Sequence, residues 1–455
     1  MRALRYCALA ATFLAAPPTA GQEAFEAELA GHALLPAMTF VPAPADAPER
    51  FDVSGRFTGP DSTRIDALYA LEGSTWIAAE DAPRTTGLYR PFVGQPVQGF
   101  SGIRALGDDR FLVLTDNGFG SQANSADAML MFHEVEIDWE TGRVHRRATT
   151  FLRDPDAILP FPIAAEHTAT RYLTGADLDL ESVQPVGDRF WFGEEFGPYL
   201  VATDRDGRVV AFHETEVDGR VVRSPDHYAV TTPAVPGEVT FAVRRSRGFE
   251  GMAVAPDGTT LYPVFEGPLW DEETGAFETD GDGNAYLRIL AFDTAEQAFT
   301  GEAYKYRLED PDHAIGDVNM IDASRALVIE RDGGEGDPRL ACADAPRPDC
   351  FNQPAAFKRV YLVDFARADA DDFVEKVGYV DLLNIQDPNG VALHGTIDGV
   401  FTFPFVTIEN VDVVDGTHIV VANDNNLPFS SGRTIGAADA NEFILLAVGD
   451  FLAAR

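Results

Sequence analysis

The stretch Thr174–Leu200, TGADLDLESVQPVGDRFWFGEEFGPYL, contains two apolar runs joined by a short polar turn at residues 186–189. Acidic residues alternate with alanine and leucine before the first run, so an extended strand would place these carboxylates on one face. The second run, residues 190–192, reads as a buried strand and also ends in acids. The predicted hairpin thus carries five carboxylates, which repel one another unless a positive charge lies between them: Asp177, Asp179, Glu181, Glu194 and Glu195.

The same layout recurs along the chain. In each copy a small or acidic residue precedes an apolar run, a turn, a second apolar run and an acidic or asparagine end. The other units begin at Ser101, Glu250, Asp317 and Glu409, and a weaker unit runs from Asp66 to Glu80. Hairpins of similar length and variable separation are typical of β-propeller blades. We therefore predict an all-β fold, a single β-propeller of six blades with loop insertions, whose innermost strands bring the acids together around one axis.

The composition limits the partners of this fold. The chain has 455 residues, 45% of them hydrophobic, and a formal net charge of −38. Such a chain has no general field for nucleic acid or anionic membranes, so we expect neither nucleic-acid binding nor membrane insertion, and we expect a monomer. An anionic substrate could still bind where a cation inverts the local potential. The alternative is that most surface acids only provide solubility or adaptation to salt.

The two ends of the expected domain differ in character. Residues 1–20 combine a basic start, an apolar run and a small-residue cleavage site, which predicts a signal peptide and a periplasmic or secreted protein. We expect an N-terminal arm at residues 21–50 and the propeller domain at residues 51–455. Two cysteines of an exported chain most simply form a disulfide, so we predict a Cys342–Cys350 bond rather than a metal site.

Several familiar catalytic motifs do not occur in the sequence. It contains no G-x-S-x-G nucleophile motif, no P-loop and no H-E-x-x-H motif. The run DGDGN, residues 280–284, begins like an EF-hand loop, but Ala285 and Ala291 stand where glycine and a bidentate glutamate are needed. This loop either binds calcium weakly or simply turns.

Several further runs resemble one known family. They are QPVQGFSGI (residues 95–103), TGADLDLESV (174–183), FGEEFGPYL (192–200), RGFEGMAVAPDG (247–258), VIERDGG (328–334) and TIENVDVVDGTHIVVANDNN (407–426). These runs resemble the bacterial phytase-like domain family, described as having an esterase-like activity of phytase. The resemblance implies that residues 51–455 are a phytase-like β-propeller, that the protein is exported, and that it hydrolyses phosphate esters or related esters.

The first functional hypothesis is a calcium-dependent hydrolase with a hard cation in the axial channel. Its substrate would be a small anionic ester, with Glu195 as the candidate catalytic base and Arg331 as the candidate substrate-binding residue. Arg331 could instead only pair with an acid such as Glu330. The candidate metal ligands are Asp177, Asp179, Glu181, Glu194, Glu250, Glu266, Asp317, Glu330, Glu409 and Asp424.

Two alternatives stay open. One is a non-enzymatic propeller that binds a ligand or partner and uses a structural calcium to join its blades. The other is a lactonase-type propeller, which shares the metal chemistry and differs in substrate.

Overall fold

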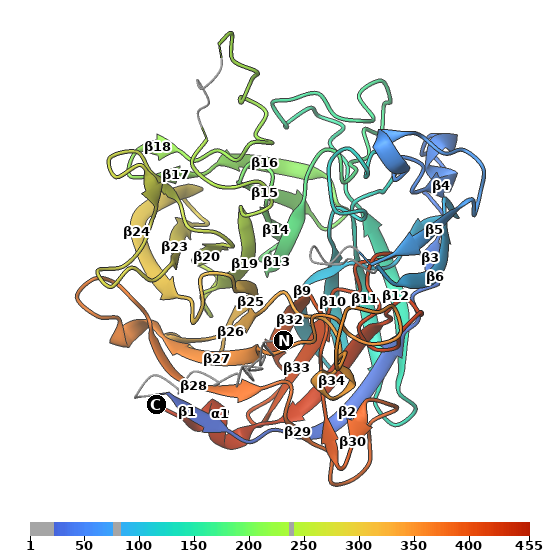
Figure 1. The fold of residues 1–455 in the computed structure, drawn as a ribbon. Coiled ribbons are helices and arrows are strands. Elements are labelled where there is room, and N and C mark those ends of the chain that lie inside the picture. The colour runs from blue at the N-terminus through green and yellow to red at the C-terminus, as the bar shows by residue number, and fades with distance from the viewer. Residues whose placement is uncertain (1–21, 76–82, 236–240) are drawn as a thin grey trace, which may run out of the picture.

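The computed structural model describes residues 22–75, 83–235 and 241–455. Nearly all of its regular structure is strand, with one short α-helix, α1 (Gly449–Ala453), near the C-terminus (Figure 1). This confirms the predicted all-β class. The predicted signal peptide, residues 1–20, lies outside the described residues.

Five four-stranded blades make up the body of the described chain. The first blade contains β9 (Phe100–Gly107), β10 (Arg110–Thr115), β11 (Met131–Asp138) and β12 (Arg143–Phe151). The second contains β13 (Leu180–Val186), β14 (Arg189–Glu194), β15 (Tyr199–Asp204) and β16 (Val209–Glu214). The third contains β19 (Phe249–Val254), β20 (Thr260–Phe265), β23 (Tyr286–Asp293) and β24 (Ala298–Arg307). The fourth contains β25 (Ala314–Met320), β26 (Arg325–Arg331), β27 (Lys358–Asp364) and β28 (Glu375–Asp381). The fifth contains β32 (Ile408–Val413), β33 (His418–Asn423), β34 (Asn441–Ala447) and β2 (Glu28–Leu35).

The innermost strands of these blades surround one axis (Figure 1). Strands β9, β13, β19, β25 and β32 contact one another in that order, and β32 contacts β9 to close the ring. The predicted propeller is therefore confirmed, and the five clear sequence units lie in five different blades.

The predicted sixth blade is not found among the described residues. Its sequence unit, Asp66 to Glu80, is described only in part, because residues 76–82 fall outside the described ranges. Strand β5 (Leu71–Ser74) pairs with β6 (Thr85–Arg90) in a two-stranded sheet and not in a blade. The closed ring of five inner strands leaves no position for another blade at the axis.

The N-terminal segment closes the propeller. Strand β2 pairs antiparallel with β34 from Glu28 to Leu35, so the fifth blade takes its outer strand from the beginning of the chain. Strand β1 (Glu23–Phe25) pairs in parallel with β28 of the fourth blade. The described part of the expected arm, residues 22–50, thus contributes strands to two blades. A single residue pair, Arg143 with Leu34, also joins β2 to β12 of the first blade.

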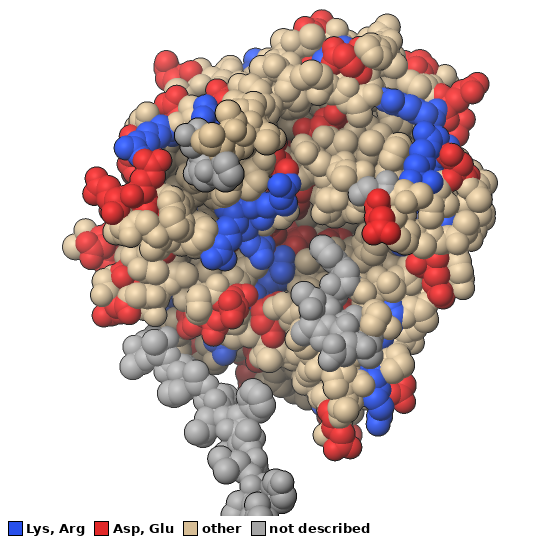
Figure 2. All heavy atoms as spheres, turned by 45° about the horizontal axis from the view of Figure 1, so that its top comes forward, with Lys and Arg blue, Asp and Glu red and all other residues tan. Residues whose placement is uncertain are grey.

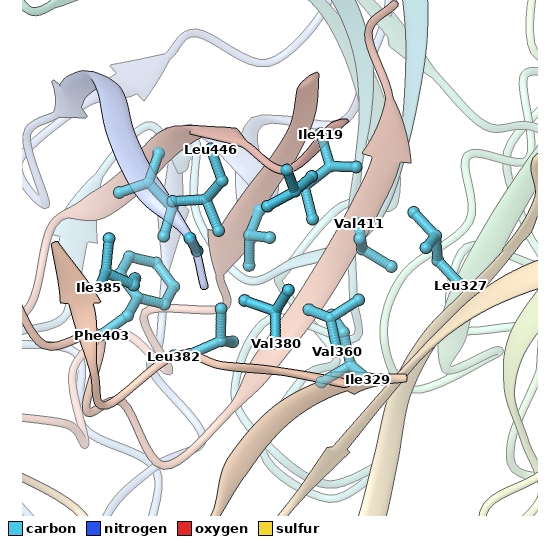
Figure 3. Close-up of a cluster of buried hydrophobic side chains, with 14 of the residues drawn as sticks. Leu327, Ile329, Val360, Val380, Leu382, Ile385, Phe403, Val411, Ile419 and Leu446 are labelled. Atoms are coloured by element: carbon cyan, nitrogen blue, oxygen red, sulfur yellow. The ribbon is translucent and has the colours of Figure 1, made fainter. Parts of the chain in front are cut away.

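The hydrophobic core lies between neighbouring blades. Figure 3 shows one such layer between the fourth and fifth blades, formed by Leu327, Ile329, Val360, Val380, Val411, Ile419 and Leu446. These side chains are fully buried, and each contributes about 1.5–3 kcal/mol of hydrophobic stabilisation. Because such layers hold the blades together, they also fix the positions of side chains at the axis.

Short strands and loops complete the structure. They include β3 (Phe40–Val41), β4 (Val53–Ser54), β7 (Phe92–Val93), β8 (Gln95–Pro96), β17 (Glu216–Val217), β18 (Arg220–Val221), β21 (Trp270–Asp271), β22 (Ala276–Phe277), β29 (Ile385–Gln386), β30 (Thr396–Ile397) and β31 (Val400–Phe401). The predicted disulfide is confirmed, with Cys342 bonded to Cys350. No helix within the described ranges has the length and apolarity needed to cross a membrane.

Candidate functional site

A β-bulge interrupts the pairing of every innermost strand near its N-terminal end. Pairing of β13 with β14 shifts after Leu180, and pairing of β19 with β20 shifts after Phe249. The same shift follows Phe100 in β9, Ile315 in β25 and Ile408 in β32. A bulge re-aims a side chain relative to the regular alternation. The residue after each of these five positions therefore occupies an equivalent place in its blade.

These equivalences define two layers along the axis. We call the residues at the bulges the bulge layer: Ser101, Glu181, Glu250, Gly316 and Glu409. The residues at the ends of the adjacent second strands form the mouth layer: Asp116, Glu195, Glu266, Arg331 and Asp424. Backbone hydrogen bonds such as Glu195 N to Asp179 O, 2.9 Å, fix the height of the mouth layer. Asp179 thus lies beside Glu195.

A third layer closes the axis below the bulge layer. We call it the lower layer: Arg104, Gln184, Ala253, Asn319 and Asp412. Gln184 Nε2 donates to Asn319 Oδ1 at 2.8 Å, and Asn319 Nδ2 donates to Val411 O at 2.7 Å. Arg104 contacts Asn319 and lies 3.4 Å from Asp412. Because this network links four blades, it leaves the mouth layer as the approach to the carboxylates.

The carboxylates of the two upper layers lie close enough to share a cation. Three overlapping groups of acids each place one carboxylate oxygen per residue within 4.8 Å of the others in the group. The groups are Asp179, Glu181 and Glu195; Glu181, Glu250 and Glu409; and Glu195, Glu250 and Glu266. Burial raises the pKa of Glu181 well above its usual range, and Asp179, Glu250 and Glu409 raise it further. Burial and the neighbouring acids likewise raise the pKa values of Glu195, Glu250 and Asp424.

Two arginines partly balance this negative charge. The Nη2 atom of Arg331 lies 2.7 Å from Glu409 Oε1, 3.7 Å from Glu266 Oε1 and 3.9 Å from Glu250 Oε1. Arg247 forms an ion pair with Glu266. Two positive charges face eight carboxylates, which are those of Asp116, Asp179, Glu181, Glu195, Glu250, Glu266, Glu409 and Asp424.

Two carboxylate oxygens in the cluster are buried and have no hydrogen-bond partner. They are Oδ1 of Asp179 and Oε1 of Glu250. Asp179 is only 2% exposed. A buried oxygen without a donor is costly. Ca²⁺ binds six to eight oxygen ligands, often carboxylates. The donor set and its unpartnered oxygens therefore fit a hard divalent cation.

The structure brings together most of the residues that the sequence singled out. Candidate residues in the cluster are Asp179, Glu181, Glu195, Glu250, Glu266, Arg331, Glu409 and Asp424. Asp424 is not a member of the three carboxylate groups, but it lies close enough to Glu409 for the charge of Glu409 to raise its pKa. The other four candidates lie outside the three groups and bind other partners: Asp177, Glu194, Asp317 and Glu330.

Asp177 and Glu194 bind backbone near the second blade. Because β13 begins only at Leu180, Asp177 lies in a turn, where its oxygens accept from Ala164 N at 2.6 Å and Thr174 N at 2.7 Å. The prediction that Asp177, Asp179 and Glu181 share one face of a strand is therefore wrong, because the strand begins only after Asp179. Glu194 accepts from the backbone N–H groups of Asp179, Phe196 and Gly197 at 2.8–3.1 Å.

Asp317 and Glu330 are each one residue away from the positions of the fourth blade that belong to the bulge and mouth layers. Asp317 accepts from Val318 N at 2.8 Å and from Val411 N at 3.0 Å. Its neighbour Gly316 holds the bulge position, and Arg331, not Glu330, holds the mouth position. The predicted unit Asp317–Glu330 thus begins one residue too late and ends one residue too early, because the pattern of acids does not reveal the bulge.

The sequence reasoning missed three residues of this region. Ser101 holds a bulge position and donates to Glu409 Oε2 at 2.7 Å. Asp116 directly follows the second strand of its repeat, where other repeats carry an acid, and this position was the signal that could have identified it. Arg247 precedes the inner strand of the third blade, and nothing in the repeat pattern indicates it.

The mouth of the channel opens into a hollow. Figure 2 shows a depression on this side of the molecule, with basic residues along one wall and acidic residues in its depth. A pocket of about 450 Å³ is lined by loops that adjoin the mouth layer, including Gly120, Gln122, Ala176, Phe196 and Arg245. A second pocket of about 370 Å³ shares Gln122, Ala176 and Phe196 with it.

Blades around a channel rich in carboxylates define a β-propeller with a candidate cation site. The chain belongs to the phytase-like family, described as "Esterase-like activity of phytase", whose model matches residues 95–427. The match includes all residues of the bulge and mouth layers.

Individual relatives are distant. An "Uncharacterized secreted protein" of Arthroderma benhamiae is 29% identical over 102 residues. The match spans 20% of this chain and 20% of that relative's length. Among solved structures, the Dos1 propeller is 9% identical with a TM-score of 0.30 and covers 81% of this chain and 74% of its own. A putative 6-phosphogluconolactonase from Bacteroides fragilis is 12% identical with a TM-score of 0.29, and the match covers 78% of this chain and 86% of that protein.

Proposed function

We propose that this chain is an exported, calcium-dependent hydrolase of phosphate esters or related esters, with its active site at the mouth and bulge layers. The observation that carries the proposal is the cluster of overlapping carboxylate groups at the axis, in which buried oxygens of Asp179 and Glu250 accept no hydrogen bond. Family membership supports the reaction class. The disulfide between Cys342 and Cys350 supports an exported protein.

Calcium would be held by residues shared between the carboxylate groups. Glu181, Glu195 and Glu250 each belong to two of the three groups, so they are central ligands. The raised pKa values in the cluster mean that the cation-free fold favours protonated acids, and this contribution to stability is lost as pH rises through the folded-state pKa values. Calcium removes the repulsion and stabilises by about 2.7 kcal/mol at a hundredfold excess over Kd.

Each catalytic requirement has a candidate residue at the axis. When bound, calcium supplies Lewis-acid polarisation of an ester oxygen. Glu195 is the candidate general base, because its carboxylate lies in the mouth layer beside the other proposed ligands, where an attacking water would approach the cation. Arg247, paired with Glu266 and with a side chain 44% exposed, can meet an anionic group arriving from the mouth. Arg331 is more deeply buried against Glu409, and we assign it to charge balance as well as substrate binding.

The experiment that tests this function is a hydrolysis panel of phytate, aryl phosphates, aryl esters and lactones with metal-stripped protein, before and after calcium is restored. We expect activity on at least one ester class to disappear on chelation and return with calcium. Glu195→Gln should lose about 10²-fold or more in kcat, as expected for a general base. Glu140→Gln, an exposed acid on a surface turn, is the matched control.

The same panel separates the alternatives. Activity that survives chelation would contradict a catalytic metal. Calcium stabilisation without hydrolysis of any ester would favour the non-enzymatic propeller. Hydrolysis confined to lactones would favour the lactonase-type reading.

A further inference from the structure

The 370 Å³ pocket beside the channel mouth has an aromatic lining. Four of its residues are aromatic, and Pro160 and Pro162 add apolar surface. The volume falls within the range of small-molecule sites. The aromatic residues are Phe161, Phe196, Tyr199 and Tyr228.

The aromatic rings already form a layered wall. Phe161 lies 6.1 Å from Tyr199 with an interplanar angle of 26°, and 5.5 Å from Tyr228 with an angle of 31°. Tyr199 is buried and fixed, because its hydroxyl accepts from Tyr228 N at 3.2 Å. Tyr228 is 41% exposed and forms the outer lip. His227 stacks on Tyr228 at 4.8 Å, so a flat ring entering from the mouth would pack against the exposed part of Tyr228 and against Phe161.

The charged groups at the pocket are already compensated. Asp177 accepts hydrogen bonds from Ala164 and from both the backbone and the hydroxyl of Thr174. Asp226 forms an ion pair with Arg245. Among the described lining residues, the pocket therefore offers a cationic ligand no uncompensated carboxylate, and its largest surfaces are aromatic rings rather than charged groups.

The pocket adjoins the channel through its own lining residues. Phe196 follows Glu195 directly, and Ala176 precedes Asp179 by three residues. In the neighbouring 450 Å³ pocket, Ser246 precedes Arg247. Consecutive Cα atoms are about 3.8 Å apart, so the backbone that lines the pocket continues directly into the backbone that carries Glu195 of the mouth layer.

We propose that the aromatic pocket binds a planar aromatic ring of the substrate, so that the protein acts on esters that carry an aryl group rather than on polyol phosphates. This inference rests on the proposed function for the reaction, and it adds the substrate class. Tyr228, Phe161 and Tyr199 are the specificity-determining residues.

The test measures binding with calcium in the buffer, using two non-hydrolysable phosphonates and one phosphate monoester whose hydrolysis is monitored during the titration. Phenylphosphonate, methylphosphonate and myo-inositol 1-phosphate are titrated by calorimetry. We expect phenylphosphonate to bind at least tenfold more tightly than methylphosphonate, and the inositol phosphate no more tightly than methylphosphonate. Tyr228→Ala should remove most of the phenyl preference. Tyr89→Ala is the matched control, because Tyr89 is 45% exposed on β6, away from the aromatic pocket.

A neutral probe separates failure of the pocket from failure of the proposed function. Benzamide carries the ring without a charge, and its saturation-transfer NMR signal should fall in Tyr228→Ala and persist in Tyr89→Ala. Benzamide binding without phosphonate binding, or without hydrolysis of any ester, contradicts the proposed hydrolase and leaves the pocket inference standing. Equal phosphonate affinities, tighter inositol phosphate binding, an unaffected Tyr228→Ala or no benzamide signal would each overturn the inference.

Discussion

Glu330 and Arg331 are neighbours in β26, yet the alternation of the strand sends their side chains to opposite surroundings. Glu330 accepts from Tyr306 Oη and Glu309 N, both at 2.7 Å, and lies 2.9 Å from Lys376 Nζ. Burial alone would raise the pKa of Glu330, but Lys376, His313 and these hydrogen bonds lower it to about 2. Glu330 is thus a structural ion-pair residue in the interior of the fourth blade.

Glu330→Gln should destabilise the fold by about 1.5–3 kcal/mol at pH 7, because buried Lys376 would keep only Glu309 as a carboxylate partner. The folded-state pKa is depressed, so this stability is present above the ordinary value of 4.5 and is lost as pH falls towards 2. Urea unfolding at pH 7, 4.5 and 3 should show the difference from wild type shrinking with acidity. A difference that grows with acidity would contradict this assignment.

Arg331 acts on the axis itself, where its Nη2 atom lies 2.7 Å from Glu409. Its charge repels a cation and competes for the Glu409 oxygen. We expect Arg331→Gln to bind calcium about tenfold more tightly or better, because a charge about 4 Å away contributes a few kcal/mol at an effective dielectric of about 20.

Calcium titration of Arg331→Gln against a chelating dye measures this effect. Arg288→Gln is the control, because Arg288 pairs with Glu278 in the third blade, away from the axial layers. Weaker calcium binding by Arg331→Gln would show that the guanidinium supports the site instead of opposing the cation.

At the scale of elements, the bulges of the inner strands determine which side chains reach the axis. In the fourth blade the bulge position is Gly316, and a Cβ there would lie 2.0 Å from Ile408 O of the fifth blade. A side chain would therefore push two inner strands apart. The close approach explains why this blade contributes no acid to the bulge layer.

Gly316→Ala should destabilise the fold by about 1–3 kcal/mol or more through this clash. Gly416→Ala, in a turn with nothing within 4 Å of the new Cβ, should change the stability much less. Thermal unfolding of both variants provides the comparison. Equal melting temperatures would contradict the close packing at Gly316.

The sequence predicted where the hairpins lie better than it predicted which of their residues face the axis. The polar turn after Val186 and the apolar run before Glu194 mark β13 and β14 correctly, because turn chemistry and apolar runs are local signals. A bulge depends on pairing with the next strand, so Asp317 and Glu330 could not be distinguished from their neighbours Gly316 and Arg331 by pattern alone.

At the scale of the whole molecule, the two ends of the chain meet in one blade. Strand β2 was not predicted, because ELAGHALL contains alanine and glycine where a strand usually carries larger residues. It pairs with β34 through tertiary contacts that the sequence does not reveal. The count of five blades likewise follows from the closed ring of inner strands, whereas the sequence offered only a weak unit at Asp66.

The global charge and the local site require different explanations. A net charge of −38 is spread over the surface, yet the acids that matter for the proposal are largely buried at the axis. Their convergence was predictable from the repeats, because equivalent positions of propeller blades face one channel. Pairing of Arg331 with an acid was one of the alternatives from the sequence, but its partner is Glu409 and not Glu330, because the partner depends on the phase of β26. The pairing of Arg247 with Glu266 was not predicted, because Arg247 lies outside the repeat pattern.

The most direct test of the central claim is calorimetric titration of metal-stripped protein with calcium, comparing wild type, Glu181→Gln and Asp282→Asn. Glu181 belongs to two of the axial carboxylate groups, whereas Asp282 is an exposed acid in the 280–284 loop that begins like an EF-hand. We predict that wild type and Asp282→Asn bind calcium alike and that Glu181→Gln loses at least about tenfold in affinity while remaining folded. Unchanged binding by Glu181→Gln, or loss of binding in Asp282→Asn, would contradict an axial calcium site.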